Sequence, residues 1–159
     1  VNGAAFGGGV GLIAACDSSI AVKGAHFGLT EARLGLVPAV ISPYVIRCIG
    51  ESHARRYFLT GERFSAIEAQ HIGLINQCVD AEQLDATVEQ TISRLLQSGP
   101  QALKNAKQLV FTISGHSRKQ QKSIDEYTSR LIAKLRVSKE GQEGLAAFLE
   151  KRDPDWIRK

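Results

Sequence analysis

Methionine is absent from all 159 residues of the chain. Val1 is therefore not a natural translation start, and we expect the chain to be an N-terminally truncated piece of a longer protein. A signal or transit peptide is left open, because the natural N-terminus is not part of this sequence. The longest apolar stretches fall well short of the ~20 residues that a membrane-spanning helix needs, so we expect no membrane partner.

Cysteine is also scarce. Cys16, Cys48 and Cys78 are odd in number and widely spaced, without a C-x-x-C pair. This pattern favours neither a disulfide framework nor a zinc site. Because their neighbours are apolar, we interpret the three thiols as buried structural cysteines in a reducing, cytoplasmic compartment.

Motifs of several common chemistries are missing. No Gly-Lys-Ser/Thr follows the glycines near the start, and the dinucleotide fingerprint G-x-G-x-x-G would need glycine where Leu12 stands. The G-x-S-x-G elbow of many serine hydrolases is absent. The histidines lack metal-ligand spacing, so we expect no metal or redox cofactor and interpret them as surface or strand-edge residues: His26, His53, His71 and His116.

Positive charge is concentrated in the second part of the chain. Residues 1–99 carry seven Lys and Arg against nine Asp and Glu, whereas residues 100–159 carry thirteen against seven. The basic residues are spaced along amphipathic stretches among acidic neighbours, which indicates a solvated helical surface. Without a basic run interleaved with aromatic residues, we expect no nucleic-acid partner.

The most informative feature present is the glycine run Gly7-Gly8-Gly9-Val10-Gly11. A strand-like apolar segment, 1–6, precedes it, and a helix-forming apolar segment, 12–16, follows. A strand, a glycine turn and a buried helix leave amide groups unpaired at the helix N-terminus. Such amides can hold an anion, or an oxygen that becomes charged during a reaction. From the glycines alone, oxyanion donation and simple close packing are equally favoured.

The pattern of the chain changes near residue 80. Before it, short apolar segments alternate with Gly and Pro and predict strands at 18–22, 26–29 and 74–79. Helices are predicted at about 43–49, 52–59 and 65–72, the last with a Ser65/Glu68 capping box. After residue 80 only helices are predicted. Their apolar stripes, which alone favour ordinary core over subunit contacts, are Leu84, Val88, Ile92, Leu95 and Leu96; Leu103, Ala106, Leu109, Val110 and Ile113; Ile124, Tyr127, Leu131 and Leu135; and Leu145, Phe148 and Leu149.

Glu31 is the candidate catalytic residue. It follows the predicted 26–29 strand and Thr30, a candidate N-cap, at the start of a short turn. Considered alone, a glutamate in this place is more often solvated, or interacts with a helix dipole, than catalytic.

An ordered series of landmarks resembles the enoyl-CoA hydratase/isomerase (crotonase) superfamily and covers essentially the whole chain. The landmarks are 1–12 with Ala15-Cys16-Asp17, Phe27-Gly28-Leu29-Thr30-Glu31, Leu34-Gly35-Leu36-Val37-Pro38, Leu59-Thr60-Gly61, Ala69 with Gly73-Leu74-Ile75, and 144–152. The resemblance implies an α/β fold, a crotonase-like spiral of ββα units followed by C-terminal trimerisation helices. Residues 1–80 would form the C-terminal part of the spiral core and residues 81–159 the helical trimerisation region.

The resemblance also implies the site. Glu31 matches the family's catalytic acid/base glutamate, and the amide of Gly8 matches an oxyanion donor, while the second donor and much of the coenzyme A site belong to the missing N-terminal part. Coenzyme A is part of the acyl-CoA substrate rather than a cofactor. A homotrimer or a dimer of trimers is expected. The expected substrate-binding residues are Gly7, Gly9, Gly11, Pro38, Ser42, Tyr44, Phe148 and Lys151.

The chain departs from the family at Gly11, where typical hydratases carry a second glutamate. Two-carboxylate water addition therefore cannot operate in its usual form. Ser42-Pro43-Tyr44 replaces a glycine-rich stretch, and with 55–60 it is similar to the bacterial methylglutaconyl-CoA hydratases, which act on branched acyl-CoA. The expected activity is hydration of a branched 2-enoyl-CoA. The alternatives are a Δ3-Δ2-enoyl-CoA isomerase and an acyl-CoA-binding member with little catalysis.

Overall fold

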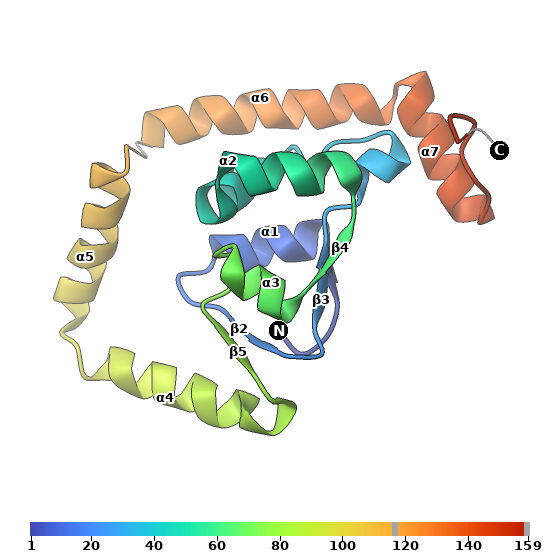
Figure 1. Ribbon diagram of the computed structural model, residues 1–159. Coiled ribbons are helices and arrows are strands. Elements are labelled where there is room, and N and C mark those ends of the chain that lie inside the picture. Colours follow the sequence, from blue (N-terminus) through green and yellow to red (C-terminus); the bar gives the residue numbers. More distant parts are fainter. Residues whose placement is uncertain (116–117, 158–159) are drawn as a thin grey trace.

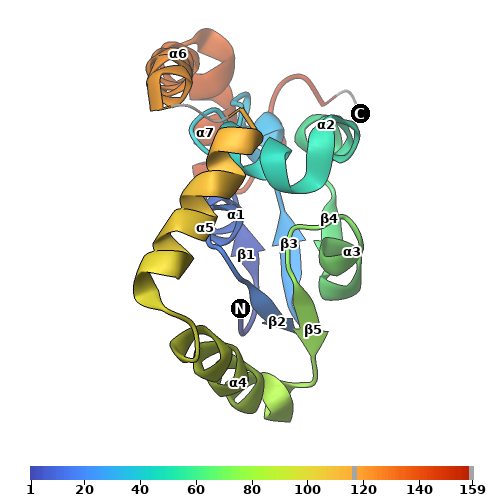
Figure 2. The same cartoon turned by 90° about the vertical axis from the view of Figure 1, so that its left-hand side faces the viewer.

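The computed structural model of the chain describes residues 1–115 and 118–157 (Figure 1). Two small sheets lie near its centre. In the first sheet β3 pairs in parallel with β1, Phe27 opposite Ala5, and antiparallel with β4, Phe27 opposite Phe64. In the second, β2 and β5 pair in parallel, so that residues far apart in sequence lie side by side (Figure 2). The strands are β1 Ala5–Phe6, β2 Ile20–Val22, β3 His26–Gly28, β4 Arg63–Ser65 and β5 Gln77–Val79.

Three helices cover these sheets: α1 Gly8–Ala15, α2 Ser42–Thr60 and α3 Ala66–His71. The core between helices and strands is apolar, and its largest fully buried side chains are Tyr57, Phe27, Leu29, Val10 and Val45. The short strands confirm the predictions near 18–22, 26–29 and 74–79, although each is shorter than predicted.

Local sequence signals explain the ends of α2 and α3. Gly50, with φ 72°, interrupts α2, which confirms the two predicted helices as its halves. The Ser65 hydroxyl oxygen accepts the Glu68 amide at 3.2 Å and caps α3. The Glu68 carboxylate accepts the Tyr57 hydroxyl at 2.9 Å. The hydroxyl half of the capping box is thus confirmed, while the carboxylate contacts α2.

The C-terminal helices extend as an arc around this core, from α4 through α5 to α6 and α7 (Figure 1). They are α4 Leu84–Leu96, α5 Pro100–Ile113, α6 Arg118–Arg136 and α7 Lys139–Glu150. Neither α4 nor α5 has a buried residue in the described chain. Leu84 packs against the core, but the rest of the predicted stripes on these two helices are not ordinary core within the described chain. None of the described helices has both the length and the apolar character to cross a bilayer.

Cys16 corrects one expectation. It is exposed, because it follows the last residue of α1, and its thiol lies 3.2 Å from the Leu12 carbonyl at the open end of the helix. Cys48 and Cys78 are half-buried. Of the four histidines, His116 lies outside the described residues.

Candidate functional site

The glycine run forms the N-terminus of α1. Gly7 is its N-cap with φ 50° and ψ −116°, a conformation that side chains strongly disfavour. The Gly7 amide donates to the Gly28 carbonyl of β3 at 3.0 Å, and the Gly7 carbonyl accepts from Val10 and Gly11. The amides of Gly8 and Gly9 occupy the first turn, where a helix offers no acceptor.

The glycines of the run differ in what a side chain would meet. At Gly8 a Cβ would have nothing within 4 Å, and at Gly9 it would make ordinary contact with Ala5 at 3.6 Å. At Gly7 it would lie 3.1 Å from Oε1 of Glu31. Close packing within the described chain therefore does not require glycine at Gly8, which leaves open space beside its amide.

Glu31 begins the short 3₁₀ helix η1 Glu31–Leu34, which ends at Gly35 with φ 64°. One carboxylate oxygen faces Gly7, and the other, Oε2, is buried without a hydrogen-bond partner among the described residues. Burial raises the pKa of the Glu31 carboxyl, although a hydrogen bond from its own backbone amide opposes the shift. Thr30 is the N-cap residue of this turn, as expected, but its side chain makes no capping hydrogen bond.

Ile41 occupies the space beside Gly11. A Cβ on Gly11 would lie 2.6 Å from the Ile41 Cβ and closer still to its Cγ2. A glutamate therefore does not fit at Gly11 unless Ile41 moves. The sequence shows the missing carboxylate but gives no signal of the side chain that takes its place.

The turn that carries Ile41 is fixed by its own hydrogen bonds. The Ser42 amide donates to the Pro38 carbonyl at 2.9 Å, and the Ser42 hydroxyl donates to the Ala39 carbonyl at 2.8 Å. Tyr44 is partly buried against the core. Pro38 and Ser42 thus lie in the turn next to α1, while their predicted contacts with substrate, and that of Tyr44, stay predictions.

Helix α7 packs against the turn that begins with Glu31. A Cβ on Gly144 would lie within 3 Å of the Leu34 carbonyl and of the Trp156 ring, and one on Gly35 would meet the backbone of Glu140. Gly141, Gly144 and Ala147 are the buried residues of this helix. The small residues at three-residue spacing were a signal for this contact that the sequence analysis did not use.

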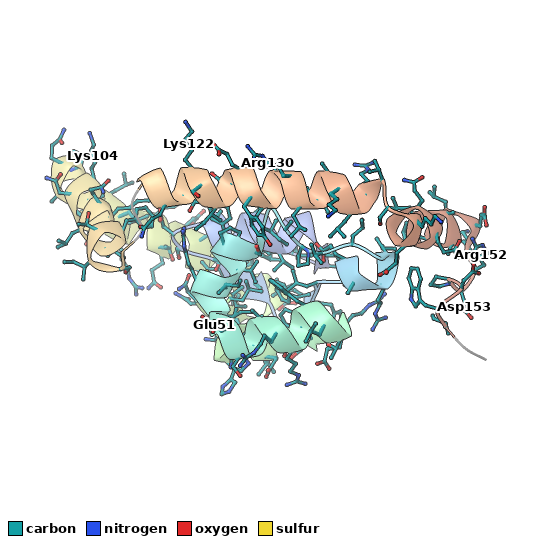
Figure 3. All side chains as sticks on the ribbon, turned by 90° about the horizontal axis from the view of Figure 1, so that it is seen from above. Glu51, Lys104, Lys122, Arg130, Arg152 and Asp153 are labelled. Carbon is teal, nitrogen blue, oxygen red and sulfur yellow. The ribbon has the colours of Figure 1, made fainter. Side chains whose placement is uncertain are left out.

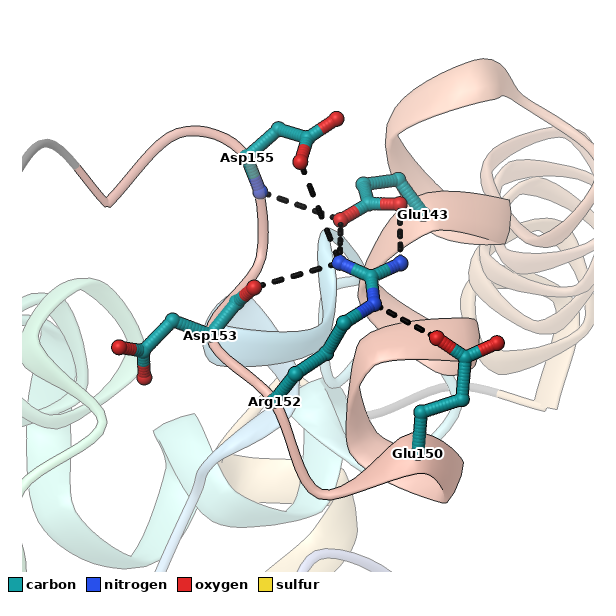
Figure 4. A network of polar contacts seen from close by, with 5 residues as sticks. All are labelled: Glu143, Glu150, Arg152, Asp153 and Asp155. Atoms are coloured by element: carbon teal, nitrogen blue, oxygen red, sulfur yellow. Dashed lines mark hydrogen bonds and ion pairs between the residues drawn. The ribbon is translucent and has the colours of Figure 1, made fainter.

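Arg152 holds the chain after α7 in place (Figure 4). Its guanidinium donates two hydrogen bonds to Glu143, at 2.6 and 2.8 Å, and one to Glu150 at 2.6 Å. The two predicted substrate residues of this region, Phe148 and Lys151, are exposed. They lie on α7 and at its C-cap, and their predicted contacts with substrate stay predictions.

Basic residues of α5 and α6 point outward. Lys104, Lys122 and Arg130 project away from the core in Figure 3, as on a solvated surface. A hollow of about 310 Å³ is lined by Arg47, Gly115, Gln120, Ser123 and Ile124, none of which is a predicted site residue. Among residues 1–115 and 118–157, no three His, Cys, Asp or Glu side chains are grouped to hold a metal ion.

Comparison with known proteins identifies relatives over nearly the full chain. The enoyl-CoA hydratase/isomerase family model matches residues 1–159. Mevalonyl-coenzyme A hydratase sidH of Aspergillus fumigatus is 33% identical over 98% of this chain and 58% of its own length. The 2,3-dehydroadipyl-CoA hydratase of Escherichia coli is 35% identical over 98% of this chain and 60% of its own length.

Solved structures agree with the sequence comparison. An enoyl-CoA hydratase from Mycobacterium avium superposes with a TM-score of 0.89 at 37% identity, over 99% of this chain and 61% of that one. One from Shewanella pealeana is 47% identical with a TM-score of 0.68, over 97% and 57%. The chain thus spans about three fifths of the length of such relatives and has the crotonase fold predicted from its landmarks. The chain belongs to the enoyl-CoA hydratase/isomerase family.

Proposed function

We propose that the protein containing this chain hydrates a 2-enoyl-CoA thioester to a 3-hydroxyacyl-CoA through an enolate. The placement of Glu31 carries the proposal, because its half-buried carboxylate lies against Gly7 beside the first-turn amides of α1. The names of the Aspergillus and Escherichia relatives, both hydratases of CoA thioesters, support hydration over other thioester reactions.

The proposed reaction begins at the thioester oxygen. The Gly8 amide donates to this oxygen as it gains charge, and one such donor is typically worth ~3 kcal/mol. Glu31 removes a proton from water, the water oxygen bonds to C3, and the C2–C3 π electrons move toward the thioester oxygen to give the enolate. Glu31 then returns the proton to C2 and the carbonyl reforms. The hydroxyl group of water is thus added to C3 and a proton to C2, and the reaction needs no oxidant or reductant.

A branched acyl group is the proposed substrate class. The sequence pattern around Ser42-Pro43-Tyr44 supports it, as does the name of the Aspergillus relative, since a mevalonyl group carries a methyl branch on C3. In this proposal Gly7, Gly9 and Gly11 border the thioester and acyl chain. The remaining substrate contacts come from Pro38, Ser42, Tyr44, Phe148 and Lys151, the last two toward coenzyme A. The protein works in the cytoplasm as a trimer or a pair of trimers.

Isomerisation is the second candidate function. The contact between Gly11 and Ile41 favours it, because a site with one carboxylate suits a reaction in which one base moves a proton between two carbons. Incubating full-length protein separately with a 2-enoyl-CoA and a 3-enoyl-CoA distinguishes the candidates. A 3-hydroxyacyl-CoA product supports hydration, whereas a migrated double bond supports isomerisation. Binding without turnover supports an acyl-CoA-binding protein.

A further inference from the structure

The contact between Gly11 and Ile41 lies next to the proposed reaction centre. Gly7 precedes α1 as its N-cap, and the Gly11 amide donates to the Gly7 carbonyl at 3.2 Å, so that Gly11 lies one turn along the helix from Gly7. The Glu31 carboxylate faces Gly7, and Ile41 faces Gly11. Glu31 and Ile41 therefore contact positions that lie one helical turn apart at the start of α1.

A helical side chain leans toward the helix N-terminus. An acidic side chain at Gly11 would therefore lean toward Gly7 and the Glu31 carboxylate. Ile41 fills the place where that side chain would begin, with its Cβ 2.6 Å from the Cβ that Gly11 lacks. The space beside Glu31 is thus bordered by hydrocarbon instead of a second carboxylate.

Ile41 is held firmly but is not fully covered. It is the N-cap of α2, and its carbonyl accepts from the Tyr44 and Val45 amides at 3.1 and 3.0 Å. Its side chain is partly buried and packs against the core. A fixed apolar group with remaining exposed surface can contact a ligand without rearranging.

We infer that Ile41 is a specificity-determining residue that selects enoyl thioesters carrying an apolar branch at C3. The inference rests on the proposed function, which places the acyl chain between the Gly8 amide and Glu31. A methyl branch on C3 fills the space against the Ile41 side chain, whereas a straight chain leaves that contact unmade. Because Gly11 has no side chain, Ile41 can approach the helix closely enough to form this wall.

The test compares turnover of 3-methylcrotonyl-CoA and crotonyl-CoA by full-length protein. The selectivity is the ratio of the two kcat/KM values. Ile41→Ala is expected to lower it by at least ~10-fold, the low end of what one methyl contact contributes to discrimination. Ile41→Val keeps the Cγ2 methyl group and is expected to keep the ratio within about threefold on the same grounds. Val40→Ala is the matched control, because Val40 is 55% exposed and adjoins Ile41.

Binding provides a readout that does not depend on catalysis. The dissociation constants of isovaleryl-CoA and butyryl-CoA, which lack the reactive double bond, are expected to show the same loss of selectivity in Ile41→Ala. An unchanged ratio in both assays overturns the role of Ile41. If the wild type turned over neither substrate, the proposed hydration would be overturned. If Ile41→Ala still changed the binding selectivity in that case, the role of Ile41 as a specificity-determining residue would stand.

The steric contact between Gly11 and Ile41 can be tested separately by melting temperature. Gly11→Ala is expected to lower the melting temperature, because its Cβ meets Ile41, and Ile41→Gly in that background is expected to restore part of the loss. Strictly additive shifts in melting temperature would contradict the interlocking of these two residues.

Discussion

Two functional groups carry out the proposed chemistry: the carboxylate of Glu31 and the backbone amide of Gly8. The buried Oε2 lacks a partner among the described residues, and burial raises the pKa of the Glu31 carboxyl because it disfavours the charged form. A carboxyl with a raised pKa holds a proton more strongly once it has accepted one, which suits a group that takes a proton and later returns it. The raised pKa depends on the burial of the Glu31 carboxyl, whose Oε2 has no hydrogen-bond partner among the described residues.

Glu31→Gln preserves shape but removes the base. Turnover by the full-length protein is expected to fall by at least ~100-fold, the low end for general acid–base catalysis. Steady-state kinetics with a 2-enoyl-CoA measures the loss, and Glu51→Gln, an exposed carboxylate on α2, is the matched control. Retained activity in Glu31→Gln would place the base on another residue.

The wild-type pH profile follows from the same carboxyl. Because burial raises the Glu31 pKa above 4.5, the base form is lost as pH falls through a value higher than 4.5, and kcat/KM decreases there. For stability the sign is opposite: the neutral form is favoured by folding, so the contribution of Glu31 is full at low pH and is lost as pH rises through the raised pKa. An acidic limb centred at or below 4.5 would contradict this environment.

Gly8→Val tests the amide next to the open space. The added side chain has room in the described chain, so the helix is expected to stay folded, but it enters the volume assigned to the thioester. Turnover is expected to fall by about 100-fold or more, the cost of disturbing one oxyanion donor. Kinetics give the loss and far-ultraviolet circular dichroism gives the helix content. Full activity would reduce the glycine run to a packing feature.

At the scale of elements, α7 supports the turn that carries Glu31, the proposed acid/base residue. Gly144 lets this helix lie close to the Leu34 carbonyl and to the Trp156 ring. The Arg152 network fixes the chain that brings Trp156 back, although most of its partners are exposed and each pair alone contributes little. The position of η1 thus depends on backbone contact with a helix more than a hundred residues away.

Gly144→Ala is expected to destabilise the protein by about 1–3 kcal/mol, as overpacking does, because its Cβ would overlap the Leu34 backbone. Since the same shift moves η1, kcat is expected to fall with it. Urea unfolding measures the first effect and steady-state kinetics the second. Gly24→Ala is the control, because a Cβ there has nothing within 4 Å. Equal stability of the two variants would show that α7 does not constrain η1.

The sequence predicted elements with strong local patterns and missed those defined by distant partners. The spacing of apolar residues was enough for α4 and α5. Strand β4, Arg63-Phe64-Ser65, has a single apolar residue, so no apolar segment marks it in the sequence, and it is defined by its pairing with β3. Likewise the resemblance predicts Glu31 as the acid/base residue, but the contact between Gly11 and Ile41 depends on how a turn packs against α1, which no local pattern encodes.

At the scale of the whole molecule, the arc of helices exposes much of its apolar surface. Leu96 is 80% exposed and Ile113 79%, and no residue of α4 or α5 is buried in the described chain. Large apolar surfaces of this kind mark interaction sites. We propose that identical chains cover this surface, in keeping with the trimer that the resemblance implies.

Full-length protein is expected to sediment as a trimer or a pair of trimers at micromolar concentration, since cyclic closure is usual for identical chains with head-to-tail contacts. Phe148, 66% exposed on α7, is expected near a subunit boundary, so Phe148→Asp should weaken assembly. Lys139→Gln, at the start of the same helix, lowers the net charge by the same single unit and is the control. A stable wild-type monomer would contradict both the trimer and the boundary.

Helix α5 has no buried residue in the described chain, and this has a consequence for how the protein folds. A helix of fourteen residues gains little stability from its own hydrogen bonds and depends on packing. The Lys107–Asp17 ion pair ties α5 to the end of α1, but both side chains are more than half exposed. A newly synthesised chain would therefore keep the amide protons of α5 exchanging rapidly with water until its apolar side is covered. Assembly would then complete the folding of this helix, instead of joining subunits that are already fully folded.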